Sequence, residues 1–144
     1  MRVIAWGPTL TPERAHQNGA EMVSKEELFR LADVVSIHLV LSRRTRSLVG
    51  ATELALMKPT ARVVNTSRGP IVVEADLVAA LREDKIAGAA IDVFDEEPLP
   101  PDHPFRRLPN VLATPHIGFV SRGLYERFYQ DTVNNILHWL EGQA

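Results

Sequence analysis

Three apolar, β-branched runs, each followed by a sharp turn that carries a polar residue, constrain the fold of this chain more than any other feature. The run 61–66 is apolar on both faces, which is typical of a strand covered on both sides, and Gly69-Pro70 ends it. The runs 86–94 and 110–114 repeat this layout and lead into DEEP (95–98) and PHIG (115–118). The pattern predicts three strands that each deliver a polar group at the carboxyl end.

Those polar groups are predicted to meet, because the carboxyl ends of parallel strands lie along one edge of a sheet, where ligands bind. Arg68 follows the first strand, and its planar guanidinium suits two-point binding of a small carboxylate. His116 can give or take a proton near neutral pH. Glu97 is expected to hydrogen-bond the far ring nitrogen of His116, which fixes the tautomer and favours the imidazolium.

The stretches NTSRGP (65–70), AAIDVFDEEP (89–98) and TPHIG (114–118) resemble the signatures of the D-isomer-specific 2-hydroxyacid dehydrogenases, and the likeness runs from Met1 to about Gly142. The resemblance implies that Arg68 binds the substrate carboxylate and that Glu97 supports the histidine. It implies that His116 is the acid/base during hydride transfer between a small 2-hydroxy or 2-oxo acid and a nicotinamide cofactor. It also implies that Asp92 contacts the nicotinamide carboxamide.

Other candidates for cofactor contact have structural alternatives. Asp92 lies inside an apolar run, where a carboxylate is costly unless it is paired or functional. Thr66 and Ser67 offer hydroxyls to a cofactor or simply close the turn, and His38 suits cofactor contact and structural hydrogen bonding about equally. Gly118 permits close backbone approach, although glycine is common after such a turn. The remaining histidines are interpreted as structural or exposed: His16, His103 and His138.

Strand and helix patterns alternate along the chain. Strands are predicted at 2–6, 21–23 and 33–41, besides the three above. Helices are predicted after the caps Thr11, Ser24 (with Glu27 as a capping box) and Thr52, and over 73–84 and 120–141. The apolar stripe of the last helix is interpreted as core, or in part as a dimer face. Alternation of this kind predicts an α/β fold, a Rossmann-type parallel sheet with helices on both faces.

Composition excludes several other classes of protein. A length of 144 residues suits one domain, and a net charge of −2 with a pI near 6.2 gives no basic surface for nucleic acid. No apolar run approaches the ~18 residues that span a membrane. The sequence has no cysteine and no signal-like amino terminus. We therefore expect a cytoplasmic protein without disulfides, metal or membrane contact.

The glycine turn of dinucleotide-binding domains, G-x-G-x-x-G, does not occur in this sequence. By the resemblance, Met1 falls at the start of the second strand of the fold. The first strand, its glycine turn, the first helix and the substrate domain are then expected to be absent, and 1–144 is interpreted as a single truncated nucleotide-binding domain. The resemblance implies NAD as cofactor, but Gly7 stands where the family usually has a ribose-binding aspartate, which leaves NADP open as an alternative.

A missing first strand predicts a gap of about two strand spacings, roughly 9.6 Å, between the strands at 2–6 and 33–41. We expect this gap to be closed by direct pairing of the two strands or by an element from a partner chain, consistent with a homo-oligomer. Two functions follow. The chain is either part of an NAD(P)-binding domain of a D-2-hydroxyacid dehydrogenase, weakly active or inactive alone, or a non-catalytic assembly module derived from one.

Overall fold

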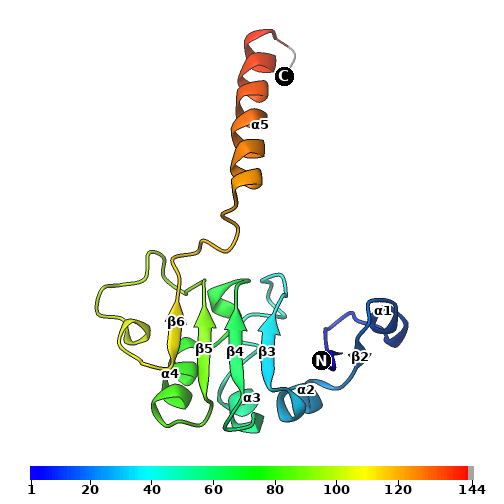
Figure 1. Ribbon diagram of the computed structural model, residues 1–144, viewed down its shortest axis with the longest axis vertical. Helices are drawn as coiled ribbons and strands as arrows, with labels where there is room; N and C mark the ends of the chain where they lie inside the picture. Colours follow the sequence, from blue (N-terminus) through cyan, green and yellow to red (C-terminus); the bar gives the residue numbers. More distant parts are fainter. Residues whose placement is uncertain (143–144) are drawn as a thin grey trace.

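Strands and helices alternate along the chain in a computed structural model that describes residues 1–142 (Figure 1). The last two residues of the predicted 1–144 domain lie outside this range. In chain order the elements are β1 (Ile4–Ala5), α1 (Pro12–Gln17), β2 (Glu21–Met22), α2 (Lys25–Leu31), β3 (Val34–Ile37), α3 (Ala51–Leu56), β4 (Arg62–Asn65), the 3₁₀ turn η1 (Gly69–Ile71), α4 (Glu74–Arg82), β5 (Gly88–Ile91), the 3₁₀ turn η2 (Pro104–Arg106), β6 (Val111–Ala113) and α5 (Arg122–Leu140). Each predicted strand and helix is present, and every strand is shorter than predicted.

The strands form two separate parallel sheets. One sheet has the order β3-β4-β5-β6, and the other contains only β1 and β2. The parallel α/β class that the sequence predicts is therefore confirmed. Of the two expected ways to close the gap, direct pairing of the first strand with the Asp33 strand is not found within residues 1–142, where β1 pairs with β2 and β3 with β4. Closure by an element of a partner chain stays a prediction.

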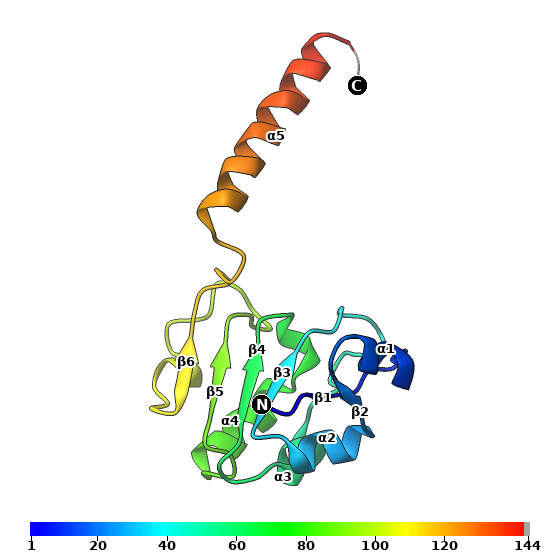
Figure 2. The ribbon, with the colours of Figure 1, turned by 45° about the vertical axis from the view of Figure 1, so that its right-hand side comes forward.

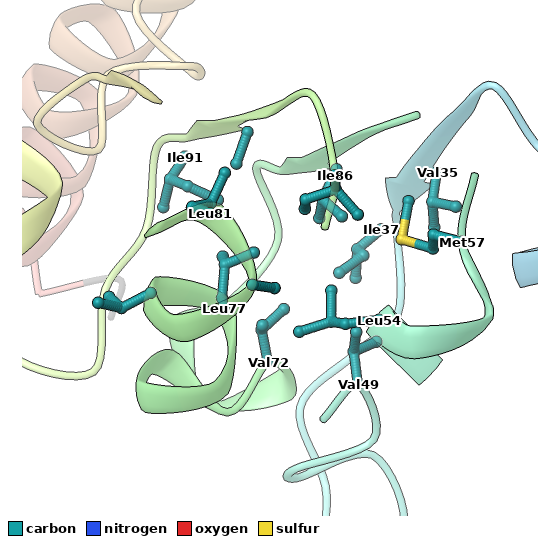
Figure 3. Packing of buried hydrophobic residues seen from close by; sticks show 14 of the residues in the cluster. Val35, Ile37, Val49, Leu54, Met57, Val72, Leu77, Leu81, Ile86 and Ile91 are labelled. Carbon is teal, nitrogen blue, oxygen red and sulfur yellow. The ribbon is translucent and has the colours of Figure 1, made fainter. Parts of the chain in front are cut away.

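The hydrophobic core lies against one face of the larger sheet. Helices α2, α3 and α4 contribute Phe29, Leu54 and Leu77 to the same cluster as Val35 of β3 and Ile91 of β5. Figure 3 shows Leu54 and Leu77 with Val35 and Ile91. All five are at most 5% exposed. Alternate residues of a strand point to opposite faces of the sheet, so every second residue of a strand can face this core.

The opposite face of the larger sheet is open. Val34 of β3 is 56% exposed, and Leu112 of β6 is 67% exposed. Ser36, two residues after Val34 in β3, is exposed too. Helices α2, α3 and α4 all contribute to the core on the other side of this sheet.

Helix boundaries follow the capping chemistry at two of three predicted sites. Thr11 caps α1 with Pro12 in the first turn, and Ser24 forms the predicted capping box with Glu27. Thr52 does not cap α3. That helix begins one residue after Gly50, whose N–H donates to Glu53 Oε2 at 3.0 Å.

Helix α5 projects away from the sheets in both ribbon views (Figures 1 and 2). None of its residues is buried, although it carries large apolar side chains such as Phe128, Ile136 and Trp139. The interpretation of its apolar stripe as core is wrong for the described chain, since no other element covers this helix.

Candidate functional site

The carboxyl ends of β4, β5 and β6 lie at one level of the larger sheet. Asn65 pairs with Ile91, and Ile91 pairs with Ala113. The chain leaves the three strands at the same edge, at the top of Figure 1. The segments that carry Arg68, Glu97 and His116 therefore start side by side.

His116 and Glu97 are in direct contact. Nδ1 of His116 lies 2.7 Å from Oε2 of Glu97, and the other carboxylate oxygen accepts a hydrogen bond from the N–H of Phe94 at 2.9 Å. The carboxylate thus holds the ring and is itself held by the backbone that ends β5. No hydrogen bond among the described residues involves Nε2 of His116, so this nitrogen is open to a ligand.

Asp92 holds the turn that presents His116. Its Oδ1 accepts hydrogen bonds from the Thr114 hydroxyl at 2.5 Å and the Ile117 N–H at 2.9 Å, and its Oδ2 accepts one from the Gly118 N–H at 2.8 Å. His116 has a φ of 54°, a left-handed conformation that costs energy for a non-glycine residue. The three hydrogen bonds to Asp92, one from Thr114 before His116 and two from Ile117 and Gly118 after it, explain why this conformation persists.

Gly118 is required by this arrangement. A Cβ at that position would lie 2.9 Å from Oδ2 of Asp92, closer than carbon and oxygen normally approach. The close backbone approach expected of Gly118 is therefore made to Asp92 of the same chain.

The carboxyl groups of Asp92 and Glu97 both have a lowered pKa and are therefore ionised at neutral pH. Burial alone would raise the pKa of Asp92, but hydrogen bonds from Thr114, Ile117 and Gly118 and the charge of His116 bring it below its ordinary value. Burial would likewise raise the pKa of Glu97, yet the bonds from His116 and Phe94 and the charges of His116 and Arg68 lower it. Glu97 at neutral pH is thus an acceptor for the Nδ1–H of the ring.

Arg68 stands at the tip of β4 with an exposed side chain. It is near enough to Glu97 for its charge to lower the pKa of that carboxyl group. Its Nη1 donates to the Ser67 carbonyl at 2.5 Å, and it forms no ion pair within residues 1–142. A guanidinium held in this way keeps further donors for an incoming carboxylate.

Two residues that the sequence reasoning missed hold the loops of the site: Asn65 at the tip of β4 and Glu74 at the loop after β5. Asn65 is 1% exposed; its Oδ1 accepts from the Ser67 N–H at 3.1 Å and its Nδ2 donates to the Arg68 carbonyl at 3.0 Å. Glu74 of α4 accepts from the Asp95 N–H at 3.3 Å and lies 3.2 Å from Nε2 of His103, so it contacts the loop on both sides of Glu97. A polar residue inside an apolar strand was the available signal for Asn65; none marked Glu74.

The other predicted cofactor residues take different places. The Ser67 hydroxyl donates to the Leu39 carbonyl at 2.5 Å and so links this turn to the segment after β3, while Thr66 is exposed. His38 Nε2 lies 2.8 Å from the Ser36 hydroxyl. His38, Leu39 and Gly7 also line a cavity between β1 and β3.

Within the described chain, no group of three or more His, Asp or Glu side chains is placed to hold a metal ion. No helix in that part of the chain has the length and apolar character needed to cross a bilayer. The arrangement can bind a carboxylate at Arg68 and transfer a proton at Nε2 of His116, whose ring Glu97 orients.

Comparison with known proteins gives a consistent result. The model of the family "D-isomer specific 2-hydroxyacid dehydrogenase, NAD binding domain" matches residues 1–118. A glyoxylate reductase of Aeropyrum pernix is 44% identical over the whole chain, which spans 43% of that protein. A D-3-phosphoglycerate dehydrogenase of Synechocystis is 43% identical over 82% of this chain and 21% of its own length. The chain therefore spans less than half the length of these relatives.

Solved structures agree with the sequence matches. A Ralstonia solanacearum oxidoreductase matches the whole chain with a TM-score of 0.92 and 43% identity, and the chain covers 42% of it. The NAD-complexed form of a D-isomer specific 2-hydroxyacid dehydrogenase from Lactobacillus delbrueckii matches 99% of the chain with a TM-score of 0.81 and 26% identity, and the chain covers 47% of it.

Proposed function

Because this chain belongs to the D-isomer specific 2-hydroxyacid dehydrogenase family and matches its NAD-binding domain, we propose that its strand-tip site serves hydride transfer between a 2-hydroxy acid and a nicotinamide cofactor. The contact of His116 with Glu97 carries this proposal, since it leaves Nε2 free and fixes the ring beside Arg68. When bound, the cofactor accepts or supplies the hydride.

The chain's own residues handle the acid and the proton. Arg68 binds the carboxylate of the substrate through its unpaired donors, which places the adjacent oxygen near His116. Nε2 of His116 takes the hydroxyl proton in oxidation and returns it in reduction. Glu97 keeps the proton on Nδ1, and Asp92 holds the turn so that the ring does not drift.

The residues present fit the nicotinamide end of such a cofactor. Thr66, Arg68 and the Asp92-bound turn supply exposed polar groups at the sheet edge, whereas the sequence contains no G-x-G-x-x-G turn to hold a pyrophosphate. We propose NAD as the cofactor, in line with the family description; NADP stays an alternative because Gly7 brings no carboxylate to reject a 2′-phosphate. Activity is proposed for a longer polypeptide, since the chain spans under half of its relatives.

A binding experiment tests the substrate half of the proposal without requiring turnover. Glyoxylate is titrated into the chain while the NMR signals of the His116 ring are followed. Saturable shifts are expected, and Arg68→Ala should weaken binding by about tenfold or more. Arg62→Ala is the matched control, because Arg62 is also exposed but lies at the opposite end of β4. Equal losses in both variants would show that charge alone attracts the acid and would contradict the proposal.

A second function, a non-catalytic assembly module, is favoured by one observation. Helix α5 has 19 residues, and none is buried. We propose a second copy of the chain as the partner that covers this helix, which gives a homo-oligomer. Light scattering should then show a mass above 16.0 kDa that falls when Phe128 and Ile136 are both changed to serine. A monomer at all concentrations would contradict this second candidate.

A further inference from the structure

The loop between β5 and β6 carries Glu97 and makes few polar contacts with the rest of the chain. Within residues 1–142, hydrogen bonds and ion pairs join loop 94–107 to residues beyond its neighbour Leu108 at three points. One point is the contact of Glu97 with His116, and the other two are both made by Glu74 of α4. Apart from the candidate site itself, Glu74 thus supplies every polar contact that fixes this loop to another element in the described range.

The two contacts of Glu74 lie on either side of Glu97. Oε2 of Glu74 accepts from the Asp95 N–H at 3.3 Å, and Oε1 lies 3.2 Å from Nε2 of His103. The side chains of Glu74 and His103 are 19% and 18% exposed, so solvent screens their contact only weakly. The residue before Asp95 is Phe94, whose own N–H donates to Oε1 of Glu97 at 2.9 Å. Glu74 therefore holds the peptide group next to the one that donates to Glu97.

Both ring nitrogens of His103 are occupied. Nδ1 accepts from the Phe105 N–H at 3.2 Å and so carries no proton, and a neutral imidazole then has its proton on Nε2. Nε2 of His103 thus donates to Glu74. The ring of His116 is used in the reverse way, with Nδ1 against Glu97 and Nε2 left for a ligand. One histidine–glutamate pair therefore holds the loop, and the other presents a ring nitrogen.

Apolar packing places this loop but does not direct the carboxylate of Glu97. Phe94, Leu99 and Phe105 belong to the hydrophobic core and are at most 8% exposed. Burial of apolar surface is non-directional, whereas an acceptor must lie within about 3 Å of a ring nitrogen and in line with its proton. The directional contacts of the loop are those made by Glu74.

We propose that Glu74 is a positioning residue, which fixes loop 94–107 to α4 on both sides of Glu97 and so keeps that carboxylate against Nδ1 of His116. Glu74 acts through Glu97 and is not itself a catalytic residue. The inference deepens the proposed function and rests on it for the role of His116 as acid and base. The orientation of the His116 ring can be measured without substrate or cofactor.

Nitrogen-15 NMR of the imidazole rings tests the proposal on the whole 144-residue chain. At about pH 8.5, where histidine is ordinarily neutral, the spectrum distinguishes a ring protonated on Nδ1 from one protonated on Nε2. Glu97 favours the Nδ1–H form of His116. Glu74→Ala removes both loop contacts, and the ratio of the Nδ1–H to the Nε2–H form at His116 is expected to fall about threefold or more.

Asp76→Ala is the matched control, because Asp76 also lies in the first turn of α4 and is half-buried like Glu74. Its Oδ2 accepts from the Ala51 N–H at 2.8 Å, so it holds helix α3 and not the loop. Asp76→Ala should lower the urea midpoint of unfolding as Glu74→Ala does, and should leave the tautomer ratio of His116 unchanged. An equal fall in both variants would show a general loosening of α4 and would overturn the proposal.

Two changes at His103 separate its two hydrogen bonds. The amide nitrogen of glutamine takes the place of Nε2 and still donates to Glu74. The oxygen of asparagine replaces Nδ1 as acceptor for the Phe105 N–H, but its side chain is too short to reach Glu74. His103→Asn should therefore lower the His116 ratio about twofold, and His103→Gln should keep it near that of the unaltered chain.

An unchanged His116 ratio in a Glu74→Ala chain that is folded by circular dichroism would overturn the proposal and leave Glu74 a purely structural residue. If Glu74→Ala does not fold, the His103 variants decide, and an unchanged ratio in His103→Asn would overturn the proposal. Failure of glyoxylate to bind the unaltered chain would contradict the proposed function alone, because the ring measurement requires no ligand.

Discussion

Two strands of this chain are each followed by a Gly-Pro dipeptide but differ in burial. β1 runs into Gly7-Pro8 and β4 into Gly69-Pro70, yet Val63 of β4 is 0% exposed while Ile4 of β1 is only half-buried. β4 pairs on both edges, with β3 and β5, whereas β1 pairs only with β2. The comparison shows that neighbouring strands decide how deeply a strand is buried, because the two sequences are similarly apolar.

The largest expected difference between the larger sheet and the β1–β2 sheet is in the free energy of unfolding that is lost when an isoleucine is replaced by alanine. Ile91→Ala in β5 removes a side chain that is 4% exposed and should lower the free energy of unfolding by about 2 to 5 kcal/mol. Ile4→Ala in β1 is the matched change and should cost less than about 1 kcal/mol, since its surroundings are already partly solvated. Urea unfolding measures both. Equal losses would mean that β1 is packed as tightly as the larger sheet in solution.

The two glycines that end these strands give the next contrast. A Cβ at Gly69 would lie 2.1 Å from the Phe94 carbonyl carbon, so the tips of β4 and β5 would have to separate. Gly69→Ala should cost about 3 kcal/mol and shift the His116 ring signals, because Phe94 also donates to Glu97. A Cβ at Gly7 would meet only Leu10 Cβ, at 3.5 Å, an ordinary contact. Gly7→Ala should therefore leave unfolding free energy and ring signals unchanged, and a comparable loss there would contradict this account.

The sequence was informative where a residue's role depends on its own segment. Thr11, Ser24 and Glu27 cap their helices as predicted, because a cap bonds to backbone only three residues away. The contact of Glu97 with His116 was also predicted, since strand order puts both at one edge. The caps need only local chemistry, whereas Glu97 was distinguished from Glu96 and Asp95 only by its place before Pro98 in the family pattern.

Features that depend on distant segments were not predictable in the same way. The three hydrogen bonds that Asp92 accepts from the turn at Thr114, Ile117 and Gly118 were not predicted, and its contact with the cofactor stays a prediction. The exposure of α5 was missed because an apolar stripe indicates that a helix needs a partner without showing that one is present. Glu74 acts on a loop some twenty residues away, a contact that no sequence pattern marks.

Two aspartates test how much a carboxylate contributes in each region. Asp92→Asn replaces an acceptor of three hydrogen bonds with an amide whose NH₂ faces backbone N–H groups, and should cost about 1.5 kcal/mol. Asp33→Asn weakens an exposed ion pair with Lys58 at 2.7 Å and should cost at most about 0.5 kcal/mol. Unfolding free energies and the amide exchange of Ile117 and Gly118 measure the difference. Unchanged exchange in Asp92→Asn would show that the turn holds itself.

The smallest expected effect is the pH dependence of the Glu97 contribution. Its folded pKa lies below the ordinary value of 4.5, so the unfolded chain takes up the proton first as the pH falls. The stability that Glu97 adds is therefore fully present above about pH 4.5 and is lost as the pH falls through the folded pKa. Because the side chain is 36% exposed, solvent screening limits this contribution to about 1 kcal/mol or less.

Asp92 and other carboxylates also titrate in acid, so the stability of the unaltered chain alone would not isolate Glu97. The informative quantity is the difference in unfolding free energy between the unaltered chain and Glu97→Gln, followed from pH 6 to pH 3. This difference should shrink toward zero in acid, because a protonated glutamate and a glutamine carry the same charge. Glu96→Gln, at an exposed neighbouring position, should show no such change. A Glu97 difference that grew on acidification would mean that burial outweighs the bonds from His116 and Phe94, and that the carboxyl group is neutral in the folded site.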